Sequence, residues 1–250
     1  MSSSTSRSTP LPSFLDPTPS ELNQIYKTLS AREQGRRILA QRSLTTKPSS
    51  SSSSLREEEA FSVRVGTSRE HMNKNRYGDI IAYDSSRILL SRLIPETSYV
   101  NASLIREPDL GFESDFLPRR YWIAAQGPVD TTVPAFLSLL LSPPSSPCSI
   151  SPLPLVQLIV QLTPLVEQNR EKCSAYFPNA KGEEWVFDRE DCEGQEEGIW
   201  VRYEGRDTEG GEVEGERRSW LRLGKEGDEK GRRVLHVEYL GWRDHGEPFF

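Results

Sequence analysis

The amino-terminal quarter of the chain carries apolar residues at helical spacing. Behind Ser20, a residue type that often caps helices, they recur at intervals of three and four: Leu22, Ile25, Tyr26 and Leu29. The Arg-rich stretch 31–41 is expected to continue this helix beyond a weak point at Gly35. A second, shorter helix is predicted over residues 55–61, because consecutive glutamates near its start suit the helix dipole.

Beyond residue 86 the pattern favours strands. Short segments rich in branched and aromatic residues, separated by turn residues, predict strands at 87–90, 98–105, 120–125, 185–187, 199–203, 220–223 and 234–240. The apolar run 155–162, bounded by prolines, is typical of a strand buried on both faces. An apolar helix is expected near 132–141, and residues 204–218 are interpreted as an expanded hairpin loop. Together these elements predict an α/β or α+β domain built on a mixed sheet.

Composition limits how much of the chain can form a core. A hydrophobic share of 35% and a mean hydropathy of −0.60 over 250 residues favour one globular domain with flexible attachments. Residues 1–18 are expected to be a disordered Ser- and Pro-rich arm, and the serine run near 45–55 a flexible linker. We therefore place the domain at 19–250, with an acidic, Gly- and Glu-rich insertion within 188–233.

Charge and cysteine usage narrow the class of partner and the compartment. The net charge of −6 argues against nucleic acid, because binding phosphates requires a basic surface. Much of the acidity lies in 182–228, so we assign it to the insertion. Polar residues and prolines interrupt the most apolar run, 153–166, which is shorter than the roughly 20 apolar residues of a membrane span, so no membrane association is expected. Three cysteines and no apolar signal segment predict a cytoplasmic location, with the nucleus as the alternative.

Five stretches occur in an order and at a spacing that together carry a family resemblance. They are Lys74 to Tyr77 (KNRY), Tyr99 to Ser103 (YVNAS), Tyr121 to Pro128, Glu167 to Pro178 with Lys172-Cys173 inside, and Trp242 to Pro248 (WRDHGEP). Over about residues 61–248 the chain resembles the protein-tyrosine phosphatase family. The resemblance implies a highly twisted mixed central sheet flanked by helices. It also implies hydrolysis of phosphotyrosine in protein substrates through a phosphocysteine intermediate, with no cofactor. We expect the protein to be a monomer.

The first stretches match the substrate-recognition part of the family pattern. By resemblance, the Tyr77 ring walls a deep slot and stacks on phosphotyrosine, and Asp79 accepts hydrogen bonds from substrate amides. The Asn101 and Gln126 segments are expected to be scaffold. Glu167 and Lys172 match groups that flank the catalytic pocket. The alternatives are a basic turn before a strand at Tyr77 and a solvated charge cluster at 167–172.

The last stretch has the clearest mechanism. A tyrosyl leaving group has a pKa near 10, so its departure at neutral pH requires an acid that delivers a proton. Asp244 matches the family's general acid, and Trp242 matches the hinge anchor of a closing loop. The family usually has proline where this chain has Arg243, which is expected to loosen the loop. The alternative interpretation is a polar turn after a strand.

The family's nucleophile is a cysteine followed six positions later by an arginine, and no cysteine here has that spacing. Six residues after Cys148, Cys173 and Cys192 are proline, asparagine and glycine. We therefore expect this chain to lack phosphatase activity, and we interpret it as a fragment of a longer enzyme, truncated before the cysteine loop. The alternative is a catalytically dead phosphatase-like binding protein. Cys173 is expected to be a buried small residue. No metal site is expected, because the three histidines lie far apart in the sequence and no Cys or His pair has a zinc spacing.

Overall fold

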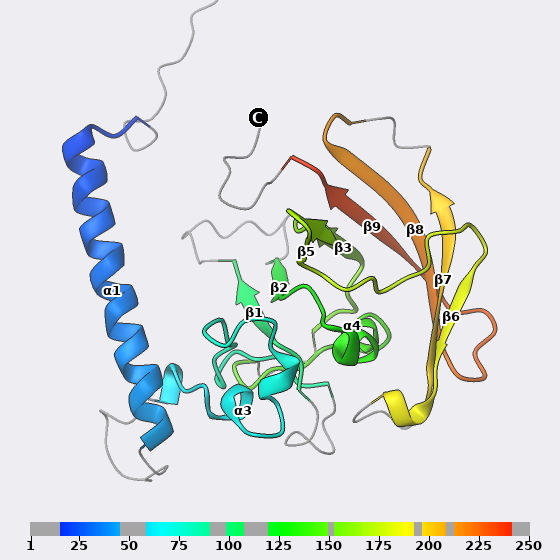
Figure 1. The fold of residues 1–250 in the computed structure, drawn as a ribbon, viewed down its shortest axis with the longest axis horizontal. Helices are drawn as coiled ribbons and strands as arrows, with labels where there is room; N and C mark the ends of the chain where they lie inside the picture. Colours follow the sequence, from blue (N-terminus) through cyan, green and yellow to red (C-terminus); the bar gives the residue numbers. More distant parts are fainter. Residues whose placement is uncertain are drawn as a thin grey trace, which may run out of the picture. The chain divides into compact units, whose positions relative to one another are not determined.

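The computed structural model describes residues 16–45, 59–90, 99–107, 120–149, 153–192, 197–208 and 213–241 (Figure 1). The chain divides into two compact units, Met1–Phe61 and Ser62–Phe250. The described part of the first unit is mainly one long helix, and all the described strands belong to the second. The predicted arm, the serine linker and the short helix at 55–61 lie largely outside the described residues.

The first unit contains α1 (Pro19–Thr45), a continuous helix of 27 residues that passes through Gly35 without interruption. Its first turn is fixed by a capping box, in which the Glu21 carboxylate accepts hydrogen bonds from the Thr18 N–H and hydroxyl, each at 2.7 Å. The cap is therefore Thr18 and not Ser20, because Pro19 takes the first helical position, for which its fixed φ is suited. Within the described ranges no helix has the length and apolar character needed to cross a membrane.

The second unit combines short helices with strands. Its helical segments are α3 (Arg64–Thr67), η2 (Met72–Lys74), η3 (Asp130–Thr132), α4 (Val133–Ser138) and η4 (Arg189–Asp191). Its described strands are β1 (Ala102–Arg106), β2 (Tyr121–Ala125), β3 (Leu158–Gln161), β4 (Val166–Glu167), β5 (Arg170–Glu171), β6 (Glu184–Phe187), β7 (Ile199–Arg206), β8 (Glu216–Lys225) and β9 (Arg232–Tyr239). β1 pairs with β2 and β4 with β5, and the remaining strands form a sheet in the order β3-β9-β8-β7-β6. β3 runs parallel to β9 and the other pairs are antiparallel, which confirms the predicted mixed sheet.

The inner face of the five-stranded sheet carries the main core. Because side chains alternate along a strand, every second residue of β7 and β8 points to this face, including the fully buried Val201, Leu221 and Leu223. α4 contributes Val133 and Leu137 to the same core and lies beside the sheet (Figure 1). Burial of each such side chain stabilises the fold by roughly 1.5–3 kcal/mol relative to exposure.

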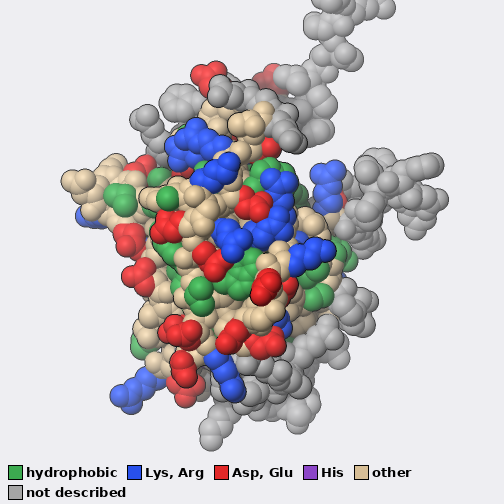
Figure 2. Space-filling view, turned by 90° about the vertical axis from the view of Figure 1, so that its right-hand side faces the viewer, with side chains coloured by type: hydrophobic (Ala, Val, Ile, Leu, Met, Phe, Trp, Pro, Cys, Tyr) green, Lys and Arg blue, Asp and Glu red, His purple; other side chains and the backbone are tan. Residues whose placement is uncertain are grey.

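The outer face of the same sheet carries charged pairs. Arg222 and Arg233 stand directly opposite each other on β8 and β9, and the Glu204 carboxylate accepts hydrogen bonds from them at 2.5 and 2.8 Å. Because like charges in opposite positions repel, Glu204 offsets an unfavourable pair. Arg202 pairs with Glu184 at 2.6 Å. Figure 2 views the side on which β6 to β9 lie in Figure 1, and it shows acidic and basic side chains interspersed over apolar ones.

β3 differs from its prediction as a strand buried on both faces. It lies at the edge of the five-stranded sheet, with Leu158 and Val160 42% and 47% exposed and Ile159 buried between them. An apolar run fits either a central strand or an edge strand whose outer side chains are uncovered, so the sequence pattern does not separate the two.

Two further predictions, of a strand and of a loop, are corrected. Residues 87–90 form isolated bridges at Arg87 and Leu89 rather than a strand. The hairpin loop predicted at 204–218 is shorter, because β7 reaches Arg206 past an irregularity between Tyr203 and Gly205. The strands predicted in the 98–105, 120–125, 185–187, 199–203, 220–223 and 234–240 segments and the helix near 132–141 are all present. β7 and β8 lie inside the acidic span 188–233, which therefore supplies strands of the sheet as well as loops.

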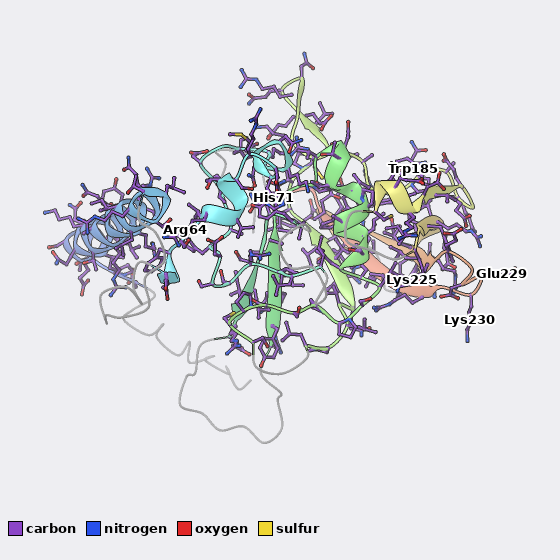
Figure 3. The ribbon with its side chains drawn as sticks, turned by 90° about the horizontal axis from the view of Figure 1, so that it is seen from below. Arg64, His71, Trp185, Lys225, Glu229 and Lys230 are labelled. Carbon is purple, nitrogen blue, oxygen red and sulfur yellow. The ribbon has the colours of Figure 1, made fainter. Side chains whose placement is uncertain are left out.

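Trp200 on β7 packs against two glycines of the β8–β9 hairpin. A Cβ atom on Gly224 would lie 2.5 Å from the Trp200 ring, and one on Gly231 would lie 2.6 Å from it. The indole N–H donates to the carbonyl of Asp228 at 3.0 Å. The hairpin thus needs residues without a side chain where it meets the ring. Figure 3 labels Lys225, Glu229 and Lys230 of this hairpin.

We expect Gly224→Ala to destabilise the second unit by roughly 1–3 kcal/mol, because the added methyl overpacks the site of the Trp200 ring. Gly78→Ala is the control, since nothing lies within 4 Å of the position of its Cβ. The control should change the free energy of unfolding by less than about 0.5 kcal/mol. Urea unfolding followed by tryptophan fluorescence measures both. Equal effects of the two substitutions would contradict this account of Gly224.

Candidate active site

Arg76 joins three segments that lie far apart in the sequence. Its guanidinium donates to the carbonyl oxygens of Gly127 at 3.0 Å and Pro128 at 2.5 Å. It also lies 3.2 Å from the Glu171 carboxylate and donates to the Ser174 hydroxyl at 3.3 Å. The Arg76 side chain is only 10% exposed, so these acceptors take the place of water around a nearly buried cation.

Two side-chain amides support the loop that contains Arg76. The Arg76 backbone N–H donates to the side-chain oxygen Oε1 of Gln126 at 2.9 Å. The Gln126 side-chain nitrogen donates to the Lys74 backbone carbonyl at 2.7 Å. Asn101 donates to the same Gln126 oxygen at 3.1 Å and to the Ile80 carbonyl at 2.6 Å. Both amides hold backbone in place, which agrees with the scaffold role expected for their segments.

Asn75 is held by a buried aromatic residue, Tyr99. The Tyr99 hydroxyl donates to the side-chain oxygen Oδ1 of Asn75 at 2.8 Å. The Asn75 side-chain nitrogen donates to the Gly66 backbone carbonyl at 2.8 Å. The Tyr99 ring stacks on His71, with ring centroids 4.9 Å apart. Figure 3 labels His71 and also Arg64, the first residue of α3. The residues before the loop tip are therefore fixed by packing as well as by hydrogen bonds.

Tyr77 and Asp79 lie at the tip of this supported loop. Tyr77 is 47% exposed and Asp79 is also exposed. Among the described residues, neither side chain has a hydrogen-bond or ion-pair partner. A fixed backbone that presents two uncommitted side chains is preorganised for a ligand, because little flexibility is lost on binding.

Glu167 and Lys172 lie on and just after a short hairpin. β4 and β5 are joined by Gln168 and Asn169, which both have positive φ, and Glu167 stands opposite Arg170. The residue of this hairpin that contacts Arg76 is Glu171, which neither the sequence pattern nor the family resemblance singles out. The residues that Arg76 contacts lie 51 to 98 positions after it in the sequence, so no local periodicity or spacing indicates the contacts.

Cys173 is buried, as expected. Burial raises the pKa of its thiol to about 11, so almost no thiolate is present at neutral pH. A Cβ atom on Gly127 would lie 2.9 Å from the Cys173 Cβ, which explains the small residue in the Gln-Gly-Pro turn. Burial likewise raises the pKa of the Cys192 thiol. Neither cysteine has the environment of a nucleophile.

A buried hydrogen-bonded triad ties the segment after Cys173 to two strands. The Tyr176 hydroxyl lies 2.6 Å from the side-chain oxygen Oε1 of Gln161 on β3 and 2.7 Å from Nε2 of His236 on β9. Burial, with a smaller contribution from the positive charge of Arg217, lowers the pKa of His236 to about 4. His236 is therefore neutral at physiological pH, and the parallel pair β3–β9 is joined to the candidate site through it.

Trp242 and Asp244, the predicted hinge anchor and general acid, follow β9 in the sequence and lie outside the described residues. The structure thus brings together the Tyr77 loop, the Gln-Gly-Pro turn and the 167–174 segment. It does not describe the position of Asp244 relative to them.

Comparisons with known proteins assign the chain to a family. The family described as protein-tyrosine phosphatase matches residues 71–249, most of the chain. The chain therefore belongs to the protein-tyrosine phosphatase family.

The relatives include receptor-type and other tyrosine phosphatases. Tyrosine-protein phosphatase 69D of Drosophila melanogaster is 30% identical over 183 residues, which cover 72% of this chain and 11% of that protein. Receptor-type tyrosine-protein phosphatase C of Rattus norvegicus is 30% identical over 201 residues, which cover 75% of this chain and 12% of that protein. The chain thus spans about an eighth or less of the length of these relatives.

A solved structure supports the fold alone. It is described as the structural basis of the PTPN18 fingerprint on distinct HER2 tyrosine phosphorylation sites. It is 23% identical to this chain, with a TM-score of 0.53, and the match covers 75% of this chain and 55% of that one.

We expect Arg76→Met to destabilise the second unit by roughly 1–3 kcal/mol, because buried carbonyl acceptors would lose their donor. Arg170→Met is the control, because Arg170 is exposed on β5 and makes no side-chain hydrogen bond among the described residues. Chemical unfolding of both variants at one pH provides the measurement. A control that loses as much stability as Arg76→Met would argue against the bridging role.

Stability should fall on acidification through His236. Its pKa is about 4 in the folded chain and near 6.5 when unfolded, so the unfolded chain binds more protons between these values. The contribution is complete above pH 6.5 and is lost as the pH falls toward 4, by up to roughly 3 kcal/mol. Unfolding free energies of the wild type and His236→Gln at pH 7.5 and 5 measure it. The variant should show the smaller change with pH, and parallel changes in both would contradict the assignment.

Proposed function

We propose that the domain to which this chain belongs recognises phosphotyrosine in protein substrates through Tyr77 and Asp79 and takes part in its hydrolysis. The single observation that carries the proposal is the set of hydrogen bonds from the Arg76 guanidinium to the Gly127 and Pro128 carbonyl oxygens. It fixes the loop backbone and leaves the Tyr77 and Asp79 side chains without partners among the described residues. An aromatic wall beside a carboxylate suits a phosphotyrosine ring flanked by peptide amides.

The reaction we propose is attack by a cysteine thiolate on the phosphorus atom. The S–P bond forms while the bond between phosphorus and the tyrosine oxygen breaks, and Asp244 gives its proton to the departing oxygen. Water then hydrolyses the phosphocysteine. Trp242 would anchor the loop that carries Asp244, and Glu167 and Lys172 would border the pocket.

We propose that the 250-residue chain is inactive by itself, because none of its cysteines suits the first step. Cys173 and Cys192 are buried, and burial raises the pKa of each thiol. Cys148 is exposed, but the residue six positions later is proline rather than arginine. The nucleophile would belong to the longer parent enzyme.

A second candidate function is binding without catalysis. Two features of the sequence favour it, namely the lack of a Cys-x5-Arg segment and Arg243 in place of the family's proline. Under either function we propose a monomeric protein of the cytoplasm that acts in signalling. All three cysteines are free thiols, which suits a reducing compartment.

Hydrolysis of a phosphotyrosine peptide separates the two functions. We expect no turnover by the 250-residue chain and turnover by a form extended through the downstream reading frame. In the extended form Asp244→Asn should lower kcat roughly 10²- to 10⁴-fold. Asp130→Asn is the control, because Asp130 is an exposed carboxylate on η3.

Inactivity of both forms, with peptide binding that is lost in Tyr77→Ala, would favour the binding protein. Turnover by the 250-residue chain would overturn the proposed inactivity, and an unchanged kcat in Asp244→Asn would overturn the role of Asp244.

A further inference from the structure

A cavity of about 490 Å³ opens on the inner face of the five-stranded sheet, away from the Tyr77 loop residues. It lies at the carboxyl ends of the parallel strands β3 and β9, where Gln161 and Glu238 line it. Its volume falls in the range of small-molecule sites, roughly 300–1,000 Å³. In α/β proteins, ligands often bind beyond the carboxyl ends of parallel strands.

Aromatic side chains form the walls of this cavity. Phe177 and Tyr203 are stacked at an interplanar angle of 25°, with ring centroids 6.0 Å apart. Trp185 of β6, labelled in Figure 3, and the buried Tyr176 also line the space. Rings in these positions offer flat apolar surface to a planar ligand.

Three polar side chains lie in one row across the sheet and line the same cavity. Arg206 of β7 is paired with Ser219 of β8, and Ser219 is paired with His236 of β9. The outer two are two strand spacings apart, about 9–10 Å. This separation suits a ring with polar substituents at opposite ends.

The donors and acceptors around His236 show which of its ring nitrogens is an acceptor. The Gln161 side-chain nitrogen donates to the Thr163 backbone carbonyl at 2.8 Å. The Gln161 side-chain oxygen therefore faces Tyr176 and accepts its one hydroxyl proton. Nε2 of His236 lies 2.7 Å from the Tyr176 oxygen and 3.1 Å from the Gln161 side-chain oxygen, so it must carry the ring proton and donate to them. This leaves a lone pair on Nδ1. Among the described residues neither this nitrogen nor the Ser219 hydroxyl has a hydrogen-bond partner, and both residues line the cavity.

Charge makes the Arg206 end attractive to an anion. Arg217 and Glu238 also line the cavity, but they neutralise each other across 2.8 Å. The Glu183 carboxylate is held by the Ala180 N–H at 3.4 Å. Arg206 has no carboxylate within ion-pair distance in the described part of the chain.

We propose that this cavity binds a small aromatic carboxylate that carries a hydroxyl group opposite the carboxylate. The ring would lie against Phe177 and Tyr203, and the carboxylate would accept hydrogen bonds from Arg206 and Ser219. The hydroxyl would donate to Nδ1 of His236. The site shares no residue with the Tyr77 loop and does not depend on phosphatase activity.

Calorimetric titration of the 250-residue chain with 4-hydroxybenzoate tests the proposal. We expect saturable one-to-one binding that Arg206→Gln and Ser219→Ala each weaken, the former roughly tenfold. Benzoate should bind more weakly, because it cannot donate to His236. The alcohol 4-hydroxybenzyl alcohol should also bind more weakly, and Arg206→Gln should not change its affinity further.

Arg202→Gln is the matched control, because it removes the same charge from the outer face of the same strand. Its affinity for 4-hydroxybenzoate should equal that of the wild type. If Ser219→Ala fails to fold, the exposed Arg206 decides the outcome alone. No saturable binding at millimolar ligand, or equal weakening by Arg202→Gln and Arg206→Gln, would overturn the proposal.

Discussion

One nearly buried guanidinium determines how the candidate site is assembled. Arg76 satisfies acceptors on the Gln-Gly-Pro turn and on the 171–174 segment, while its own backbone is held by Gln126. A buried cation is stable only where its donors are matched, so these segments must adopt this arrangement together. The exposed loop tip, which would otherwise be flexible, thereby acquires a defined position.

The two faces of the five-stranded sheet carry different side chains, because successive residues of a strand point to opposite faces. The inner face holds the apolar core and, toward the carboxyl ends of β3 and β9, the polar triad and the cavity. The outer face is covered with paired charges. Consequently one sheet provides the apolar core, a cavity on its inner face and a charged surface on its outer face.

Local patterns were enough to locate most strands and the mixed sheet, because alternating or branched runs report directly on pleated structure. They failed where the outcome depends on distant partners. The run 155–162 does not indicate that β3 is an edge strand, and no spacing links Arg76 to Glu171. Tyr77 and Asp79 could be selected only through a family resemblance. Their exposure agrees with a binding role, whereas Asp244 lies outside the described residues.

The shared carboxylate of Glu204 also has a consequence for the evolutionary record. Because it separates two arginines that face each other across β8 and β9, loss of the acid alone would leave a repelling pair. Lineages should therefore replace positions 204, 222 and 233 together or retain all three. The correlated substitution of these columns in an alignment would reveal a sheet contact that no single sequence displays.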